Sequence, residues 1–134
     1  MLIPFEMVME QAPVSSQTRR RQRFHEWQQD LARAARLVWD TEAPVAVPVS
    51  VTITYFFDDT PVDVDNIPKP ILDALKGLVF RDDSQVYDLL CRKRNRADNL
   101  RIEGPSQDLL DALNNSRQVL HIKVTAAQNQ EIAF

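Results

Sequence analysis

Hydrophobic periodicity divides the chain into seven elements. Residues 49–57 (VSVTITYFF) alternate β-branched and polar side chains and predict a strand, and residues 2–9, 86–95 and 118–126 are interpreted as three more strands. A helix is predicted from Gln22 to Asp40, after a loop over 10–21. Its apolar positions repeat every three or four residues and form one stripe: Phe24, Trp27, Leu31, Ala34, Ala35 and Val38.

Two shorter helices complete the pattern. One begins near Pro68, with Pro68 and Pro70 in its first turn, and ends at Gly77 as a C-terminal cap. The other spans residues 105–115. Their apolar faces are predicted to hold Ile71, Leu72, Leu75 and Leu78 in the first, and Leu109, Leu110 and Leu113 in the second. The order β-α-β-α-β-α-β predicts an α+β fold (an α/β sandwich), with one small sheet of about four strands and helices packed on it.

The length of 134 residues fits a single domain over 1–134, in which residues 127–134 are expected to be a loose tail. Cys91 is the only cysteine, so neither an internal disulfide nor a cysteine zinc cluster can form, and a reducing, cytoplasmic compartment is expected. No apolar run approaches the roughly 20 residues that a membrane span needs, so no membrane partner is expected.

The net charge of −3 disfavours a nucleic-acid partner, but the charges are unevenly distributed. Seven aspartates lie in residues 58–83, between two basic segments rich in arginine, the residue type that binds phosphate bidentately. We hypothesise that the basic segments bind DNA; the alternative, that they are solvated surface, stays open. The residues concerned are Arg19, Arg20, Arg21 and Arg23 in the first segment, and Arg92, Lys93, Arg94 and Arg96 in the second.

The acidic segment contains a candidate metal site. Asp63 and Asp65 are two residues apart, which on an extended backbone places both carboxylates on one face. Asp83 follows the next short helix and can converge on the same point. Carboxylate oxygens suit a hard ion, Mg²⁺ or Mn²⁺, and Lys69 can contact a scissile phosphate, so the set suits phosphodiester hydrolysis. An Asp-x-Asp pair alone is more often a turn or a cap.

The run VDVDNIPKPILDALKGLVFRDDSQV, residues 62–86, resembles the signature of RusA-like endodeoxyribonucleases. The resemblance extends more loosely over 44–96. It implies a RusA-like fold and a homodimeric Holliday junction resolvase that uses Mg²⁺ or Mn²⁺ to place paired nicks in four-way DNA during recombination and repair. By position it implies metal-binding catalytic roles for Asp63, Asp65 and Asp83, a supporting catalytic role for Lys69 and a lesser role for Asp82.

Some features leave alternatives open. The loop over 12–21 and the segment 97–116 depart from the family pattern, and both can touch DNA, so junction selectivity stays open. A nuclease of flaps or RNA and a non-cutting DNA- or protein-binding module are the alternative functions. The dimer patch is not defined by the sequence; an edge strand or the Phe56-Phe57 region are candidates. His25, His121 and Cys91 are interpreted as structural.

Overall fold

The computed structural model describes residues 3–40, 43–127 and 131–134, and its elements follow the predicted order. Two short 3-10 turns, η1 and η2, are added to the predicted pattern. The elements are β1 (Phe5–Met9), α1 (Arg21–Trp39), β2 (Val49–Phe57), η1 (Val64–Asn66), α2 (Pro68–Leu75), η2 (Asp83–Gln85), β3 (Val86–Asn95), α3 (Gln107–Asn115) and β4 (Val119–Ala126).

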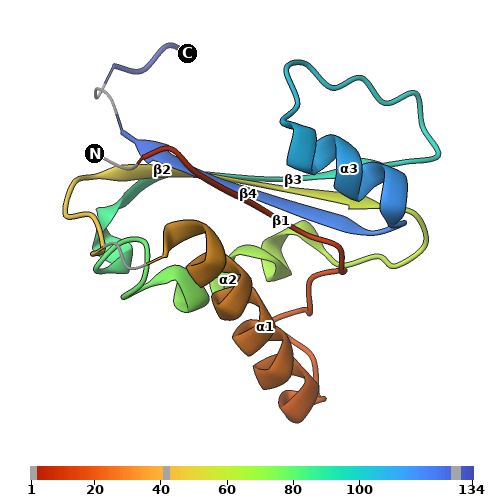
Figure 1. Cartoon of the computed structure of the whole chain (residues 1–134), viewed down its shortest axis with the longest axis horizontal. Helices are drawn as coiled ribbons and strands as arrows, with labels where there is room; N and C mark the ends of the chain where they lie inside the picture. The colour runs from red at the N-terminus through yellow and green to blue at the C-terminus, as the bar shows by residue number, and fades with distance from the viewer. Residues whose placement is uncertain (1–2, 41–42, 128–130) are drawn as a thin grey trace.

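The four strands form one mixed sheet in the order β1-β4-β2-β3 (Figure 1). β4 is antiparallel to both β1 and β2, whereas β2 and β3 are parallel. The parallel pair is connected by the loop, α2 and η2, because parallel neighbours need a crossover connection. The predicted α+β fold with one small sheet is confirmed.

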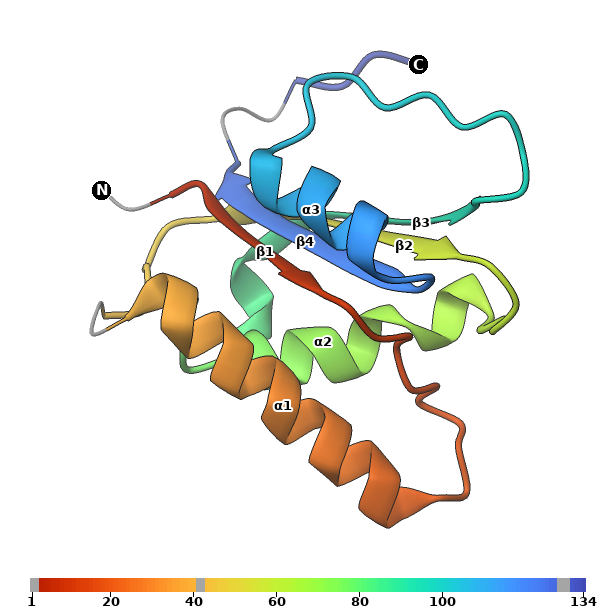
Figure 2. The ribbon, with the colours of Figure 1, turned by 45° about the vertical axis from the view of Figure 1, so that its right-hand side comes forward.

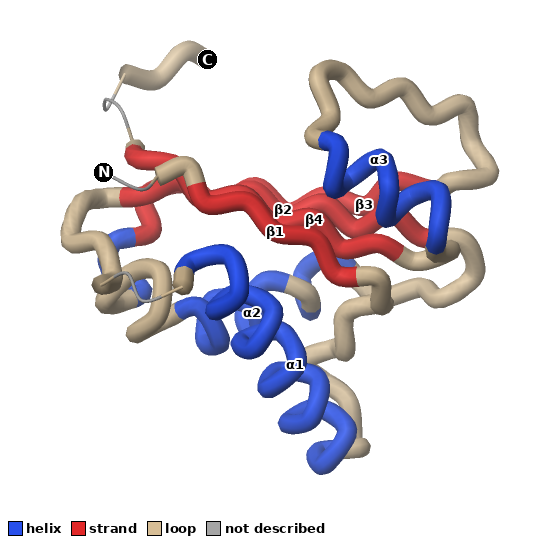
Figure 3. Tube along the Cα trace, in the orientation of Figure 1, coloured by secondary structure: helices blue, strands red, loops and turns tan. Residues whose placement is uncertain are grey.

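The helices form layers on both faces of the sheet, with α1 and α2 on one face and α3 on the other (Figures 1 and 2). The main core lies beneath α1 and α2, where Val49, Val51, Ile53 and Tyr55 of β2 point. The next residue in the alternation, Phe56, points to the other face and packs with Leu109, Ala112 and Val119 under α3. A long loop connects β3 to α3 (Figure 3), and its residues Leu100 and Ile102 pack against this second cluster.

Three predicted side-chain positions are corrected by the packing. On α1, Trp39 is buried, and Val38, predicted in the stripe, is 51% exposed, since the core extends along one narrower side of the helix. On α3, Ala112 is buried in place of Leu110. Phe56, one of the residues named for the dimer patch, is 4% exposed beneath α3 and belongs to the core.

The C-terminal boundary is also shifted. The Ala127 backbone N–H donates a hydrogen bond to the Pro48 carbonyl over 2.9 Å, so this residue is held against the sheet and is not part of a loose tail. Residues 131–134 are exposed without regular structure, and the remaining predicted tail, 128–130, lies outside the described residues. No helix in the described part of the chain is long and apolar enough to cross a membrane.

Candidate functional site

The Asp-x-Asp pair lies at a tight turn. Asp63 has an extended backbone, but the chain then enters η1, where the Asn66 N–H donates to the Asp63 carbonyl over 2.9 Å. The prediction of an extended backbone through both aspartates is therefore wrong, because Asp65 lies within a hydrogen-bonded 3-10 turn. Both carboxylates are exposed, and neither forms a hydrogen bond or ion pair with any residue that the structure describes.

Asn66 connects this turn to the loop that carries the arginines. Its backbone carbonyl accepts from the Ser16 N–H over 3.0 Å, and its side-chain oxygen accepts from the Ser16 hydroxyl over 3.3 Å. Two bonds across fifty residues fix η1 relative to the segment that leads into α1. The asparagine of the motif thus has a positioning role that the sequence interpretation did not assign.

Lys69 lies one turn beyond Asp65, at the start of α2. Pro68 and Pro70 occupy the first turn, as predicted, and Gly77 adopts the positive φ of 81° expected after the helix. The Lys69 ammonium forms an ion pair with Asp73 over 3.1 Å. The hydrogen bond that Lys69 donates to Asp73, the charge of Asp73 and, to a lesser extent, the charge of Asp83 raise the pKa of Lys69, so the amine stays cationic.

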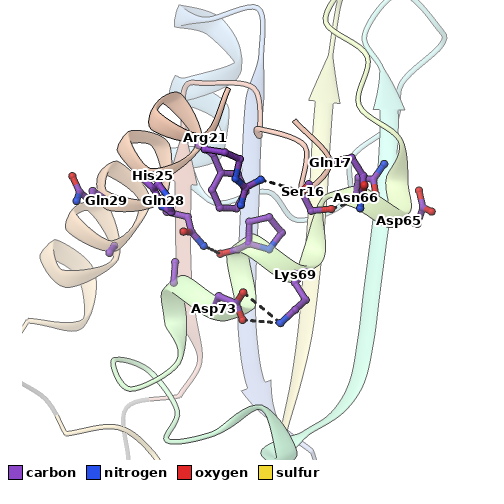
Figure 4. A pocket seen from close by; sticks show the side chains of 14 residues that line it. Ser16, Gln17, Arg21, His25, Gln28, Gln29, Asp65, Asn66, Lys69 and Asp73 are labelled. Atoms are coloured by element: carbon purple, nitrogen blue, oxygen red, sulfur yellow. Dashed lines mark hydrogen bonds and ion pairs between the residues drawn. The ribbon is translucent and has the colours of Figure 1, made fainter. Parts of the chain in front are cut away.

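An open groove of about 880 Å³ lies between the N-terminal half of α1 and α2 (Figure 4). Arg21 and His25 line it from α1, and Lys69 lines it from α2. Asp65 also lines the groove, although Figure 4 shows its carboxylate pointing away from the centre. The groove therefore joins one motif carboxylate and the motif lysine to the arginine-bearing end of α1.

The second acidic pair, Asp82 and Asp83, lies at η2, and its two members differ in their hydrogen bonding. The Asp82 carboxylate accepts from the Ser84 N–H over 3.1 Å, and the Gln85 side chain accepts from the Asp82 N–H over 2.9 Å, which forms a capping box. The bonds to Ser84 hold the pKa of Asp82 below its usual value. Asp83 differs: its Oδ1 is buried without a hydrogen-bond partner among the described residues.

The structure does not hold the three predicted ligands as a ready-made set. Among the described residues, no three His, Cys, Asp or Glu side chains lie together in a group that could hold a metal ion. Asp63 and Asp65 precede α2 in the chain, whereas Asp83 comes eight residues after its end, in η2. The charge of Asp83 still acts on Lys69.

The first basic segment is exposed at the entrance to α1. Arg19, Arg20 and Arg23 are exposed, whereas the Arg21 guanidinium donates to the carbonyls of Ser16 and Thr18 over 3.4 and 3.3 Å and lies 4.2 Å from the Phe24 ring centroid. Arg21 thus helps to hold the loop in shape, and the others are free to reach a ligand.

The second basic segment is divided by the strand it occupies. Lys93 lies 5.2 Å from the centroid of the Phe57 ring, on the α2 side, whereas Arg92 donates to Thr54 over 2.8 Å on the α3 side, where Arg94 also points. Arg96 donates to the carbonyls of Leu113 (2.6 Å) and Ser116 at the end of α3. Consecutive basic residues therefore do not form one patch, and Arg96 has a structural role that the sequence did not reveal.

Gln85 was also missed. Besides accepting from Asp82, its amide donates to the carbonyls of Val45 and Val47, each over 2.9 Å, which ties η2 to the segment before β2. A signal was present, because the motif contains three uncharged polar residues, Asn66, Ser84 and Gln85, and each lies within two residues of an aspartate.

The comparisons with known proteins define first a class and then a family. The family described as Endodeoxyribonuclease RusA matches residues 9–103, which include η1, α2, η2 and β3. Comparison with curated protein sequences gave no match. The match places the chain in the class of endodeoxyribonucleases. Because it covers more than half of the 134 residues, the chain belongs to the RusA family, as the motif predicted.

Proposed function

We propose that this protein is a metal-dependent endonuclease that resolves four-way DNA junctions by paired nicks in recombination and repair. The family match carries the proposal, because it includes the whole motif from Asp63 to Asp83. The groove between α1 and α2 supports it, since Asp65, Lys69 and Arg21 all line it. A phosphodiester substrate needs this combination of acidic and cationic side chains.

The proposed cofactor is Mg²⁺ or Mn²⁺, bound by Asp63, Asp65 and Asp83. The donor set fits such an ion because all three ligands are carboxylates, which hard cations prefer. The buried Asp83 Oδ1 without a partner also fits, since an unpaired buried carboxylate oxygen is costly unless a cation or donor satisfies it. The three side chains do not form a preassembled set, so binding requires some of them to move.

The chain's own residues have separate roles in the proposed reaction. Asp63, Asp65 and Asp83 would hold the ion, which would supply the activation of a water molecule for attack on the phosphate. Lys69 exchanges its ion pair with Asp73 for a contact with the scissile phosphate, where its charge stabilises the transition state. Arg19, Arg20 and Arg23 bind the DNA backbone beside the groove, and Lys93 approaches from the same face of the sheet.

We also propose a homodimer, because two symmetric nicks are most simply made by two equivalent sites related by a two-fold axis.

The variant Asp65→Asn tests the proposal. An amide keeps the shape of the side chain but loses the charge that a cation requires, so cleavage of a synthetic four-way junction with Mg²⁺ should be abolished. Calorimetric titration of the free protein with Mn²⁺ should show weaker binding. DNA binding should be retained, because removing a carboxylate reduces repulsion of phosphate.

The control is Asp98→Asn, an exposed aspartate in the turn after β3, which should cut like the wild type. Flap, linear duplex and RNA substrates are assayed in parallel, with and without Mg²⁺. Undiminished nicking by Asp65→Asn contradicts the metal-site assignment. Cleavage confined to flaps or RNA contradicts the junction substrate, and binding without cleavage by the wild type would identify a non-cutting module.

A further inference from the structure

The outer edge of β3 is exposed and apolar. β3 is the last strand of the sheet and is ten residues long, and β2 is its only partner strand within the described residues. Tyr87, Leu89 and Leu90 on it are 57%, 45% and 50% exposed. The opposite edge strand, β1, has only five residues. None of the exposed large hydrophobic side chains among the described residues lies on it. A long edge strand with exposed apolar residues is a template for pairing with another strand.

Apolar residues are exposed on both faces of this edge. Leu89 pairs with Val51 and lies on the face covered by α1 and α2. Leu90 pairs with Thr52 on the α3 face, where Asp88 and Arg92 flank it two residues away on either side. Because alternate residues share a face, the α3 side of the strand shows the symmetric pattern acidic–leucine–basic around Leu90.

We propose that the β3 edge of a second copy of this chain pairs with it in antiparallel orientation, about a two-fold axis that passes between the two Leu90 residues. The two sheets then form one sheet of eight strands. Leu90 lies opposite Leu90 of the partner subunit, and Leu89 lies opposite Cys91 of the partner subunit. Both exposed leucines are covered by apolar side chains.

Charge complementarity supports this register. Asp88 lies opposite Arg92 of the partner subunit, and the two-fold generates a second identical pair. Each side chain is already oriented by β2: the Asp88 Oδ2 accepts from the Ser50 hydroxyl over 3.3 Å, and the Arg92 Nε donates to Thr54 over 2.8 Å. Opposite charges on directly facing residues stabilise a strand pair.

Other registers fit less well. A two-fold axis at Leu89 places Asp88 opposite Leu90 of the partner subunit. A two-fold axis at Cys91 places Leu90 opposite Arg92 of the partner subunit. Each of these registers leaves a charged side chain facing a leucine. A two-fold at Arg92 brings two arginines face to face, which is repulsive.

This arrangement rests on the proposed homodimer and specifies how the candidate sites of the two subunits are placed relative to each other. A two-fold between antiparallel strands is perpendicular to the sheet, so the α1 and α2 layers of both subunits lie on one side. Both grooves can then face the same DNA. The pairing also brings the basic end of each β3 next to the first residues of the other, which follow the turn η2 that begins at Asp83.

Disulfide cross-linking tests the register. In a Cys91→Ala background, Leu90→Cys places two thiols on directly facing residues, with Cβ atoms about 5 Å apart, and should form a covalent dimer upon mild oxidation. Tyr87→Cys is the matched control, because it is similarly exposed but six residues from its own symmetry mate, about 20 Å away. Equal cross-linking of the two variants, or none with Leu90→Cys, overturns the register.

Charge exchange tests the ion pairs independently. Asp88→Arg and Arg92→Asp should each weaken the dimer at least tenfold in light scattering or sedimentation, whereas the double variant should restore it. Leu37→Asp, at an 86% exposed site on α1, should leave the dimer unchanged. Dissociation by Leu37→Asp, or no effect of either β3 charge reversal, contradicts the β3 interface.

The outcomes separate this inference from the proposed function. A wild-type dimer that cuts junctions but fails the β3 tests leaves the nuclease proposal intact and refutes the interface. A wild-type monomer refutes both the homodimer and the interface, while the nuclease assay with Asp65→Asn is interpreted separately.

Discussion

Neighbouring residues in the turn before β3 have different roles although their side chains are chemically alike. Asp82 is occupied by the backbone of its own turn, and Asp83 keeps a buried oxygen without a partner among the described residues. The Gln85 side chain bonds to the backbone of two segments. It accepts from the N–H groups of Arg81 and Asp82 and donates to the carbonyls of Val45 and Val47. Because Asp82 and Gln85 make the hydrogen bonds that the turn backbone needs, the Asp83 carboxylate is left available as a ligand.

Replacing Gln85 by alanine is expected to affect both stability and the metal site. The variant loses four hydrogen bonds and leaves the carbonyls of Val45 and Val47 without their donor, which should lower the free energy of unfolding by about 2 kcal/mol. Because η2 is released, Mn²⁺ affinity should fall as well. Urea denaturation and calorimetric titration measure the two effects. Gln11→Ala, at an exposed position, is the control, and an effect of equal size there would contradict this role.

Glu6 and His121 make a pH-dependent contribution on the α3 face. His121 Nε2 lies 2.6 Å from the Glu6 carboxylate, and this hydrogen bond is the main cause of the lowered Glu6 pKa; Ser106 and Lys123 add smaller effects. Since the folded-state pKa lies below 4.5, the stabilisation is present above that pH and is lost as pH falls through the folded-state pKa.

His121→Ala should therefore raise the Glu6 pKa towards 4.5, as measured by a carboxyl-carbon NMR titration. Lys123→Ala should raise it less, since the lysine is the smallest of these causes. A larger shift with Lys123→Ala would show that charge, and not the hydrogen bond to His121, determines the lowered value.

At the scale of elements, local periodicity was sufficient to predict β2 and β3 with the bounds observed, and α1 to within one residue at each end. Apolar residues repeat every two positions in a half-buried strand and every three or four in a helix. Local periodicity alone therefore indicates these elements. The relation between η1, α2 and η2 was not accessible, because it depends on how the chain folds back after the helix and not on local periodicity. The separation of Arg92 from Lys93 was accessible in principle, since a strand alternates its faces.

The loop before α1 is predicted to bind the DNA backbone through Arg19 and Arg20. Both are exposed, whereas Arg21 is used in holding the loop. Replacing Arg19 and Arg20 with alanine should weaken binding to all DNA shapes and flatten the log-log salt dependence by about two units, at about 0.9 per phosphate contact. Cleavage of bound substrate should change little, because the motif residues are untouched.

The charge-matched control is the double variant Arg33→Ala and Arg36→Ala, further along α1, where Arg33 pairs with Asp30 over 3.1 Å. Affinity and salt slope are measured by fluorescence anisotropy. If both double variants flatten the slope equally, net charge accounts for the effect, and a defined contact at Arg19 and Arg20 is refuted.

At the scale of the whole molecule, the part of the chain that carries the family motif depends on a strand beyond it. The family match ends at residue 103, before α3 and β4. β4 nevertheless lies between β1 and β2, so the sheet is continuous only through it. The candidate site is attached to β2 and β3, and its geometry therefore depends on the last strand of the sequence.

A chain that ends at Glu103 is expected not to fold. It lacks β4, in which Val119, Leu120, Ile122 and Val124 are fully buried. Burial of such side chains contributes about 1.5–3 kcal/mol each, or roughly 6–12 kcal/mol together. Domains of this size are stable by only about 5–15 kcal/mol. A chain that ends at Glu131 and lacks only the exposed residues 132–134 should unfold cooperatively like the full chain. Thermal unfolding followed by circular dichroism compares the two, and cooperative unfolding of the 1–103 chain would show that β1, β2 and β3 form a sheet without β4.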